Sequence, residues 1–207
     1  MRRADDYRAN GERLKPLENA IKSYLHLPHV TVMNSSKILK VGDKAPNFLM
    51  QGILPQGIDR NFLADNADIK ILSFYPAVFS GILKMPRNIA MNQSCINPLN
   101  CKRQTSLLDK LTIHTKKHKN IVLKKYLMSN TTSALLEAWY NITETKNMYY
   151  LNDPDASIAQ QYNALDKEGY LTRITYVIDA LGIIRGIFDL QTEEDILNLK
   201  QWLENNY

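Results

Sequence analysis

The 207-residue chain is 44% apolar, contains two cysteines and carries a formal net charge of +5 at neutral pH. This length and apolar fraction suit one domain with an appendage, and two cysteines are too few for a disulfide scaffold. No apolar run approaches the roughly 20 residues of a membrane span, and the charged N-terminus does not resemble a secretory signal. Basic residues gather at 116–119 and 124–125 without interleaved aromatics, so we expect a solvated helix end and strand edge there and no nucleic-acid partner. We expect a cytoplasmic protein that does not associate with membranes.

The N-terminal segment, residues 1–28, is expected to be a helical extension. Its apolar residues recur at spacings of three and four, which places them on one helix face: Leu14, Leu17, Ile21 and Leu25. Because such a stripe has no use in water, we expect it to pack on the main domain or in a homodimer contact. The alternating runs His29–Met33 and Lys37–Val41 predict a small hairpin, and Ile53–Asn66 is expected to be a loop.

From residue 69 onward, apolar runs typical of strands alternate with helical patterns. The expected strands are 69–75, 121–128, 148–151, 172–179 and 183–189. Helices are expected after Cys101, Asn130, Asp153 and Thr192. The apolar side of the last helix should consist of Ile196, Leu197, Leu199 and Trp202. This alternation predicts a mixed α/β sheet covered on both faces, in one domain spanning residues 29–207.

Cys101 is the strongest candidate for a reactive group, because it lies where the strand Ile69–Tyr75 and a following loop give way to a helical pattern. The first turn of a helix has unpaired N–H groups and a positive dipole end, which both favour the nucleophilic thiolate. Cys95 forms a disulfide with it if the loop brings the two Cα atoms within about 7 Å; otherwise one or both thiols are inert. His114 and His118 have no third ligand nearby, so we expect no metal and no other cofactor.

Several segments, taken in order, resemble the peroxiredoxins and among them the thiol peroxidase branch. The segments are Val41–Phe48, Ile71–Pro76, Cys101–Thr105 with Leu108, Arg173–Asp179 and the hairpin at 29–41. The resemblance covers about the last four-fifths of the chain and implies a thioredoxin-like sheet flanked by helices, with the N-terminal helical extension added to it. It also implies that Cys101 is the peroxidatic cysteine and that Arg173 is the active-site arginine.

The sequence departs from the family's active-site pattern of proline, three residues, threonine or serine, two residues and cysteine. Pro76 and Ser80 reproduce its first part, but Leu83 occupies the cysteine position. Residues 83–100 therefore look inserted, and we expect them to loop outward so that Cys101 docks in the usual pocket; the alternative is a displaced helix start. The branch's resolving cysteine is also missing from the expected helix Ser133–Asn141, which leaves Cys95 as the resolving candidate.

Two functions remain open at this point. The first is a thiol-dependent peroxidase, an antioxidant oxidoreductase that reduces hydrogen peroxide or small organic hydroperoxides and is restored by thioredoxin or another thiol. The second is a binding or structural module that keeps the fold and has lost the reaction. Single residues also have two interpretations. Arg173 is either the cation beside the thiolate or an edge-strand arginine in an ion pair. Ser80 either orients the substrate or is a turn serine before a glycine.

Overall fold

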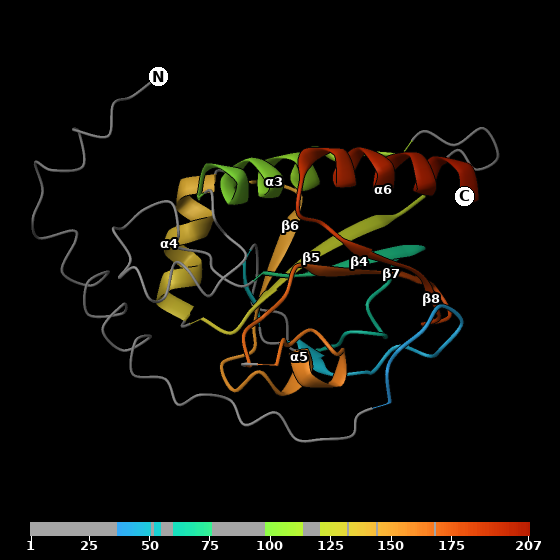
Figure 1. Ribbon diagram of the computed structural model, residues 1–207, viewed down its shortest axis with the longest axis horizontal. Coiled ribbons are helices and arrows are strands. Elements are labelled where there is room, and N and C mark those ends of the chain that lie inside the picture. The colour runs from blue at the N-terminus through green and yellow to red at the C-terminus, as the bar shows by residue number, and fades with distance from the viewer. Residues whose placement is uncertain are drawn as a thin grey trace, which may run out of the picture.

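A computed structural model gives the fold as one mixed sheet with helices on both faces and a separate two-stranded sheet (Figure 1). Among the helices it describes, none has the length and apolarity needed to cross a bilayer. The expected N-terminal extension and the first arm of the expected hairpin lie outside the described residues. Those residues are 37–50, 52–54, 60–75, 98–113, 121–131, 133–143, 145–167 and 169–207.

Among the described residues, the main sheet has six strands in the order β2-β6-β5-β4-β7-β8. Strands β4, β5 and β6 run parallel to one another, whereas β2, β7 and β8 pair antiparallel with their neighbours. The expected strands are therefore confirmed, and they form one sheet with β4 in its interior. The bounds are β2 Gly52–Leu54, β4 Ile69–Phe74, β5 Leu123–Ser129, β6 Met148–Asn152, β7 Ile174–Asp179 and β8 Ile184–Asp189.

Strand β4 is buried along its whole length, which explains its almost unbroken apolar sequence. Side chains alternate between the two faces of a strand, so Ile69 and Ile71 enter one core and Leu72 and Phe74 enter the other. The two cores lie on opposite sides of the sheet. A strand that supplies both cores must be central, as the sequence pattern predicted.

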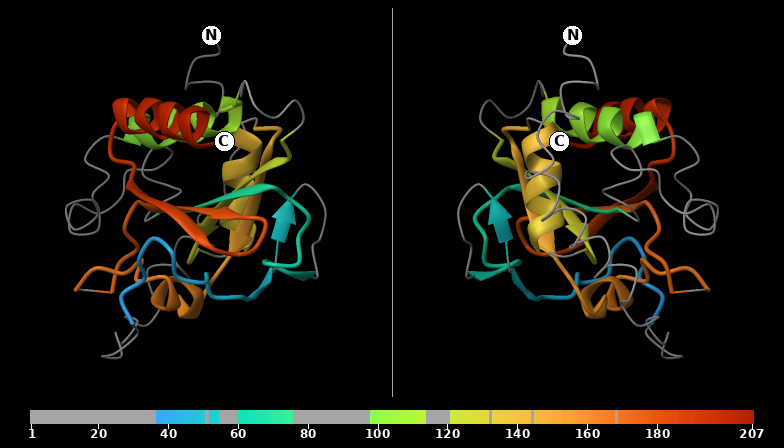
Figure 2. Two further views of the ribbon diagram at one scale, coloured as in Figure 1. Left: turned by 90° about the vertical axis from the view of Figure 1, so that its right-hand side faces the viewer. Right: turned by 90° about the vertical axis from the view of Figure 1, so that its left-hand side faces the viewer.

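In the described part of the chain, three helices cover the first face: α3 (Pro98–Lys110), α4 (Ser133–Thr143) and α6 (Glu193–Asn206). Figure 2 shows α3 and α6 side by side above the sheet. Thr192 caps α6 as expected, with its side chain accepting from the Asp195 N–H in a capping box. The buried stripe of α6 consists of Ile196, Leu199 and Leu203. Leu197 was wrongly expected on that stripe: one step round the helix from Ile196, it is 63% exposed.

The second face is covered by the short helix α5 (Ser157–Gln161) and by the small sheet of β1 (Leu49–Met50) and β3 (Arg60–Asn61). Its core is rich in aromatic rings, with Phe48 and Phe62 stacked at 4.7 Å between ring centroids. The loop expected over residues 53–66 is thus partly wrong, because β3 lies within it and the end of β2 overlaps it. Both strands are only two or three residues long, and tertiary pairing rather than a local pattern creates them.

The second arm expected for the hairpin, Lys37–Val41, is not a strand. Its backbone N–H groups donate to side chains and not to a neighbouring strand. The Leu39 N–H donates to Asn163 Oδ1 at 2.8 Å, and the Lys40 N–H donates to Asp43 Oδ2 at 2.9 Å. The Lys37 side chain and this backbone bond hold the pKa of Asp43 below its usual range. Local bonds to the Asp43 carboxylate therefore replace the ladder that the alternating sequence suggested.

The expected solvated strand edge at Lys124–Lys125 is wrong, because β5 is an interior strand. Lys125 is buried, and its Nζ donates to the carbonyls of Asp109 and, at 3.1 Å, Leu111, at the C-terminal end of α3. Burial lowers the pKa of Lys125. On the other face of the sheet, Lys124 Nζ lies 2.8 Å from a carboxylate oxygen of the buried Asp65. Lys125 thus satisfies carbonyls that the helix leaves open and fixes where α3 ends.

Candidate active site

The carboxyl end of β4 and the start of β7 bring Tyr75 and Arg173 together. These strands are antiparallel neighbours, and Ser73 pairs with Thr175, so Arg173 lies opposite Tyr75. The backbone of each is anchored to the next strand: Tyr75 N–H donates to Met128 at 3.0 Å, and the Arg173 carbonyl accepts from Leu190 N–H at 3.2 Å. The sheet therefore holds both residues at one end of its interior strands, beneath the first turns of α3.

Arg173 is a buried cation, with only 2% of its surface exposed. Its guanidinium carbon lies 5.7 Å from the centroid of the Tyr75 ring, within the range of a cation–π contact, and its Nη1 donates to Gln104 Oε1. Burial lowers the pKa of Arg173 from its ordinary 12.5. The edge-strand interpretation of this arginine is wrong, because β7 lies between β4 and β8. Arg173 therefore places positive charge inside the core that α3 covers.

Gln104 joins this cation to the helix and to the end of β8. Its Oε1 accepts from Arg173, and its Nε2 donates to the Gln191 carbonyl at 2.7 Å. One residue earlier in α3, Arg103 forms an ion pair with Glu193 at the start of α6. The first turns of α3 are thus fixed to both the guanidinium and the neighbouring helix. Sequence reasoning gave Gln104 no role, although it lies within the segment Cys101–Thr105 that resembles the family motif.

The backbone places Cys101 in the first turn of α3, as predicted from the sequence. The helix begins at Pro98, three residues earlier than Cys101, so 98–100 belong to the helix and not to an inserted loop. Proline suits this position because its missing N–H has no partner in a first turn. Helical spacing puts position 101 on the same face as Gln104, Thr105 and Leu108, all buried. Position 101 and Gln104 therefore lie about one turn apart along the same side of the helix.

The Tyr75 ring that contacts the guanidinium carries a buried hydroxyl group, which interacts with the buried Thr105 side chain. Tyr75 and Thr105 are almost fully enclosed, and burial raises the pKa of the Tyr75 hydroxyl well above its ordinary 10. Next along β4, Thr175 Oγ1 donates to Ser73 Oγ at 3.0 Å. A set of neutral donors and one cation, enclosed in an apolar core beside a helix N-terminus, is suited to stabilising a small anion.

The remaining site residues expected from the sequence lie outside the described residues. These are Pro76, Ser80 and Cys95, together with most of the expected insertion, 83–97. The pairing of Cys95 with Cys101 and the place of the Ser80 hydroxyl therefore stay predictions. Among the described residues, the structure brings together Arg173, Gln104, Tyr75 and Thr105, within one helical turn of the Cys101 backbone.

No protein-family model matches the chain, and no curated protein is similar to it in sequence. Solved structures do match. A peroxiredoxin-like protein from Aquifex aeolicus has a TM-score of 0.58 at 13% identity, over 81% of this chain and 90% of that one. A thiol peroxidase from Chromobacterium violaceum has 0.57 at 15% identity, over 82% and 88%. AhpC of Mycobacterium tuberculosis has 0.55 at 15% identity, over 81% and 99%. The chain therefore has a thioredoxin-like α/β fold of the peroxiredoxin type, as the sequence motifs predicted.

Proposed function

We propose that this protein is a thiol-dependent peroxidase in which Cys101 is the peroxidatic cysteine. One observation carries the proposal: the buried Arg173 guanidinium is held by Gln104, one helical turn from Cys101 and on the same helix face. The fold shared with thiol peroxidases supports it as well. The substrate class is hydrogen peroxide or a small organic hydroperoxide, and the reductant is thioredoxin or another thiol. We further propose that the enzyme acts as a homodimer in the cytoplasm.

The chemistry follows from the charges in the site. The Cys101 thiolate attacks one peroxide oxygen, an S–O bond forms and the O–O bond breaks. The cysteine becomes a sulfenic acid, oxidised by two electrons, and the second oxygen leaves as hydroxide or alkoxide and takes up a proton. The N–H groups at the start of α3 and the Arg173 cation favour negative charge on the sulfur before attack and on the departing oxygen after it.

Recovery needs a second thiol. A thiol that attacks the sulfenic acid forms a disulfide and releases water, and a further thiol then reduces that disulfide. Helix α4 has the sequence SALLEAWYNIT and supplies no cysteine. We propose Cys95 for this role, in a disulfide with Cys101, with Ser80 and Pro76 shaping the substrate pocket.

The test follows oxidation of the reduced protein by hydrogen peroxide, with trapping of sulfenic acid and mass spectrometry of each cysteine. Oxidation of Cys101 should be far faster than that of free cysteine and should be lost in Cys101→Ser. Cys95→Ser should still form the sulfenic acid but no internal disulfide. Arg173→Met should slow oxidation at least 100-fold, as expected for one charge-stabilising donor.

A matched control is Arg185→Met, because Arg185 is half exposed in an ion pair with Asp179, far less buried than Arg173. It should leave the oxidation rate unchanged. Arg173→Lys keeps the charge, so it separates loss of the cation from loss of folding, which circular dichroism also checks. Oxidation of Cys101 no faster than that of free cysteine would end the peroxidase proposal. The alternative, a binding or structural module, would then be favoured by the missing cysteine in α4.

A further inference from the structure

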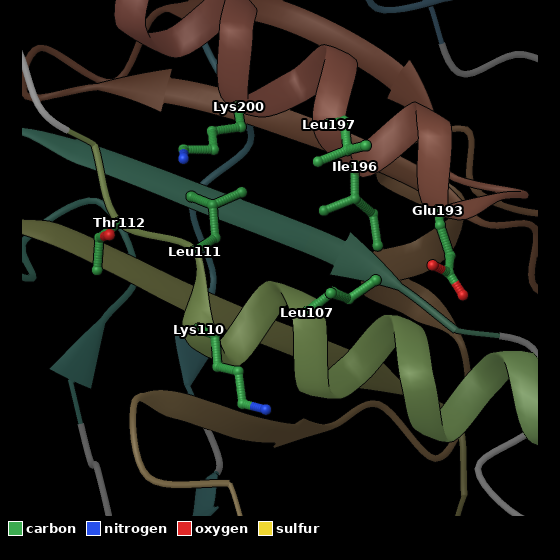
Figure 3. A pocket seen from close by; sticks show the side chains of 8 residues that line it. All are labelled: Leu107, Lys110, Leu111, Thr112, Glu193, Ile196, Leu197 and Lys200. Carbon is green, nitrogen blue, oxygen red and sulfur yellow. The ribbon is translucent and has the colours of Figure 1, made fainter.

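A groove of about 210 Å³ runs between α3 and α6 on the face away from the sheet's second core. Figure 3 shows its apolar side chains turned toward one another from the two helices, above β4. Leu111 and Ile196 are buried, whereas Leu197 is 63% exposed in the middle of α6. Charged side chains border it, with Lys200 at one end and Glu193 at the other. An apolar groove with charged ends, lying between two helices, can bind the apolar stripe of a third helix.

The chain contains such a stripe in the N-terminal segment. Leu17, Ile21 and Leu25 recur at four-residue spacing, and Leu14 precedes them. On a helix, Leu17 to Leu25 covers about 12 Å, and Glu193 to Lys200 covers about 10 Å along α6. Stripe and groove therefore have matching lengths. We propose that residues 14–25 pack as a helix in the α3–α6 groove of their own chain.

Charged side chains of both signs border the groove and the segment. Lys200 lies at one end of the groove, where it also forms an ion pair with Glu204, and Glu193 lies at the other end. In the N-terminal segment, Lys15, Glu18 and Lys22 directly follow Leu14, Leu17 and Ile21. A docked helix fills the space between α3 and α6 with its apolar residues and leaves these charged groups at the solvent-facing rim.

The connecting chain is long enough. Twelve peptide steps separate Leu25 from Lys37, where the described chain begins, and an extended chain of that length spans about 40 Å. A domain of some 170 residues has a radius of gyration of about 15 Å, so the segment can pass round the sheet to the groove. A nearer apolar surface exists around Ile38, Val41 and Leu181, each exposed. Those residues lie on irregular chain and in turns, whereas a groove is found between α3 and α6, which is why we assign the segment to α3 and α6.

The experiment uses the full-length chain with Cys95→Ser and Cys101→Ser, so that only engineered cysteines remain. One variant carries Ile21→Cys with Leu197→Cys, and a mild oxidant tests whether the pair forms a disulfide, which requires Cα atoms within about 7 Å. Two matched controls are Ser23→Cys with Leu197→Cys, from the opposite face of the segment, and Ile21→Cys with Leu181→Cys, at the nearer surface. Intact mass and non-reducing gels distinguish a link within one chain from a link between two.

We expect rapid disulfide formation within one chain for the Ile21 and Leu197 pair, at least tenfold faster than for either control. Equal rates for Ile21 and Ser23, a faster link to Leu181, a link between two chains, or no link would each overturn the proposal. Thermal unfolding gives a second measurement in the native cysteine background. Leu197→Gln should lower the melting temperature by about 4 °C and Leu181→Gln by less than about 1 °C. Equal, small shifts would contradict a covered groove.

Discussion

Replacing Gln104 by leucine should test how the buried cation is held. Leucine has a similar volume and a good helix propensity, so the change removes polar atoms with little effect on packing or on α3 itself. It deletes the acceptor for Arg173 Nη1 and the donor that reaches the Gln191 carbonyl at 2.7 Å. The buried Arg173 guanidinium and the partly buried Gln191 carbonyl each lose this partner.

The expected loss follows from those two bonds. A hydrogen bond to a charged group contributes about 1.5–3 kcal/mol, and a partly buried carbonyl that loses its donor costs about 1 kcal/mol. Together they predict that Gln104→Leu lowers the free energy of unfolding by about 3 kcal/mol. Gln104→Glu keeps an acceptor for the guanidinium and should lose only about 1 kcal/mol. Arg103→Ala removes an exposed ion pair with Glu193 and should cost less than about 1 kcal/mol.

Urea unfolding followed by circular dichroism measures all three variants, with the transition midpoint and slope fitted together. The reasoning requires the order Arg103→Ala, Gln104→Glu, Gln104→Leu in increasing loss. A Gln104→Leu variant within about 1 kcal/mol of the native protein would refute it, because Arg173 would then be held adequately by its other contacts. A changed slope would indicate a less compact folded state and not the loss of two bonds.

Three further predictions concern groups away from the site. Burial raises the pKa of Asp153 to about 6 from its ordinary 3.8, so its contribution to stability is present below pH 3.8 and lost as the pH rises through 6. Relative to Asp153→Asn, the native protein should lose about 2.5 kcal/mol between pH 4 and pH 7.5, and a constant difference would contradict this. Lys125→Met leaves the final carbonyls of α3 unsatisfied and should cost about 2 kcal/mol in urea unfolding, whereas an unchanged midpoint would show that water replaces the ammonium. Gly186→Ala places a Cβ 2.6 Å from the Phe188 ring and 3.3 Å from Trp202, so overpacking should cost about 2 kcal/mol, visible as a lower melting temperature unless both rings move aside.

The elements predicted well from the sequence are those whose signal is local. The apolar run of β4 and the Thr192 cap of α6 each depend on neighbouring residues. Strands β2 and β3 carry no such signal, because pairing with distant chain makes them strands. The lysines of β5 were wrongly expected at a solvated edge for a related reason. Composition does not reveal that Lys125 binds carbonyl groups and that Lys124 binds the Asp65 carboxylate once the chain has folded.

The candidate site shows the same division. Position 101 at a helix start was visible in the sequence, and the family motifs pointed to Arg173. The partner of Arg173 was not visible, because Gln104 lies 69 residues away along the chain and meets it only once β4, α3 and β7 are assembled. Burial of the arginine likewise depends on the strand order. The sequence left open whether β7 was an edge strand, and the structure places it inside the sheet.

The distance along the chain between the parts of this cluster has a consequence for biosynthesis. The Gln104 side chain donates a hydrogen bond to the carbonyl of Gln191, which lies 87 residues later in the chain. At translation rates of roughly 5–20 residues per second, about 4 to 17 seconds pass between the synthesis of the two. During that interval Cys101 and Gln104 have been made, but the two partners of the Gln104 side chain have not both been made. The cluster around Arg173 therefore assembles only when almost the whole domain can fold.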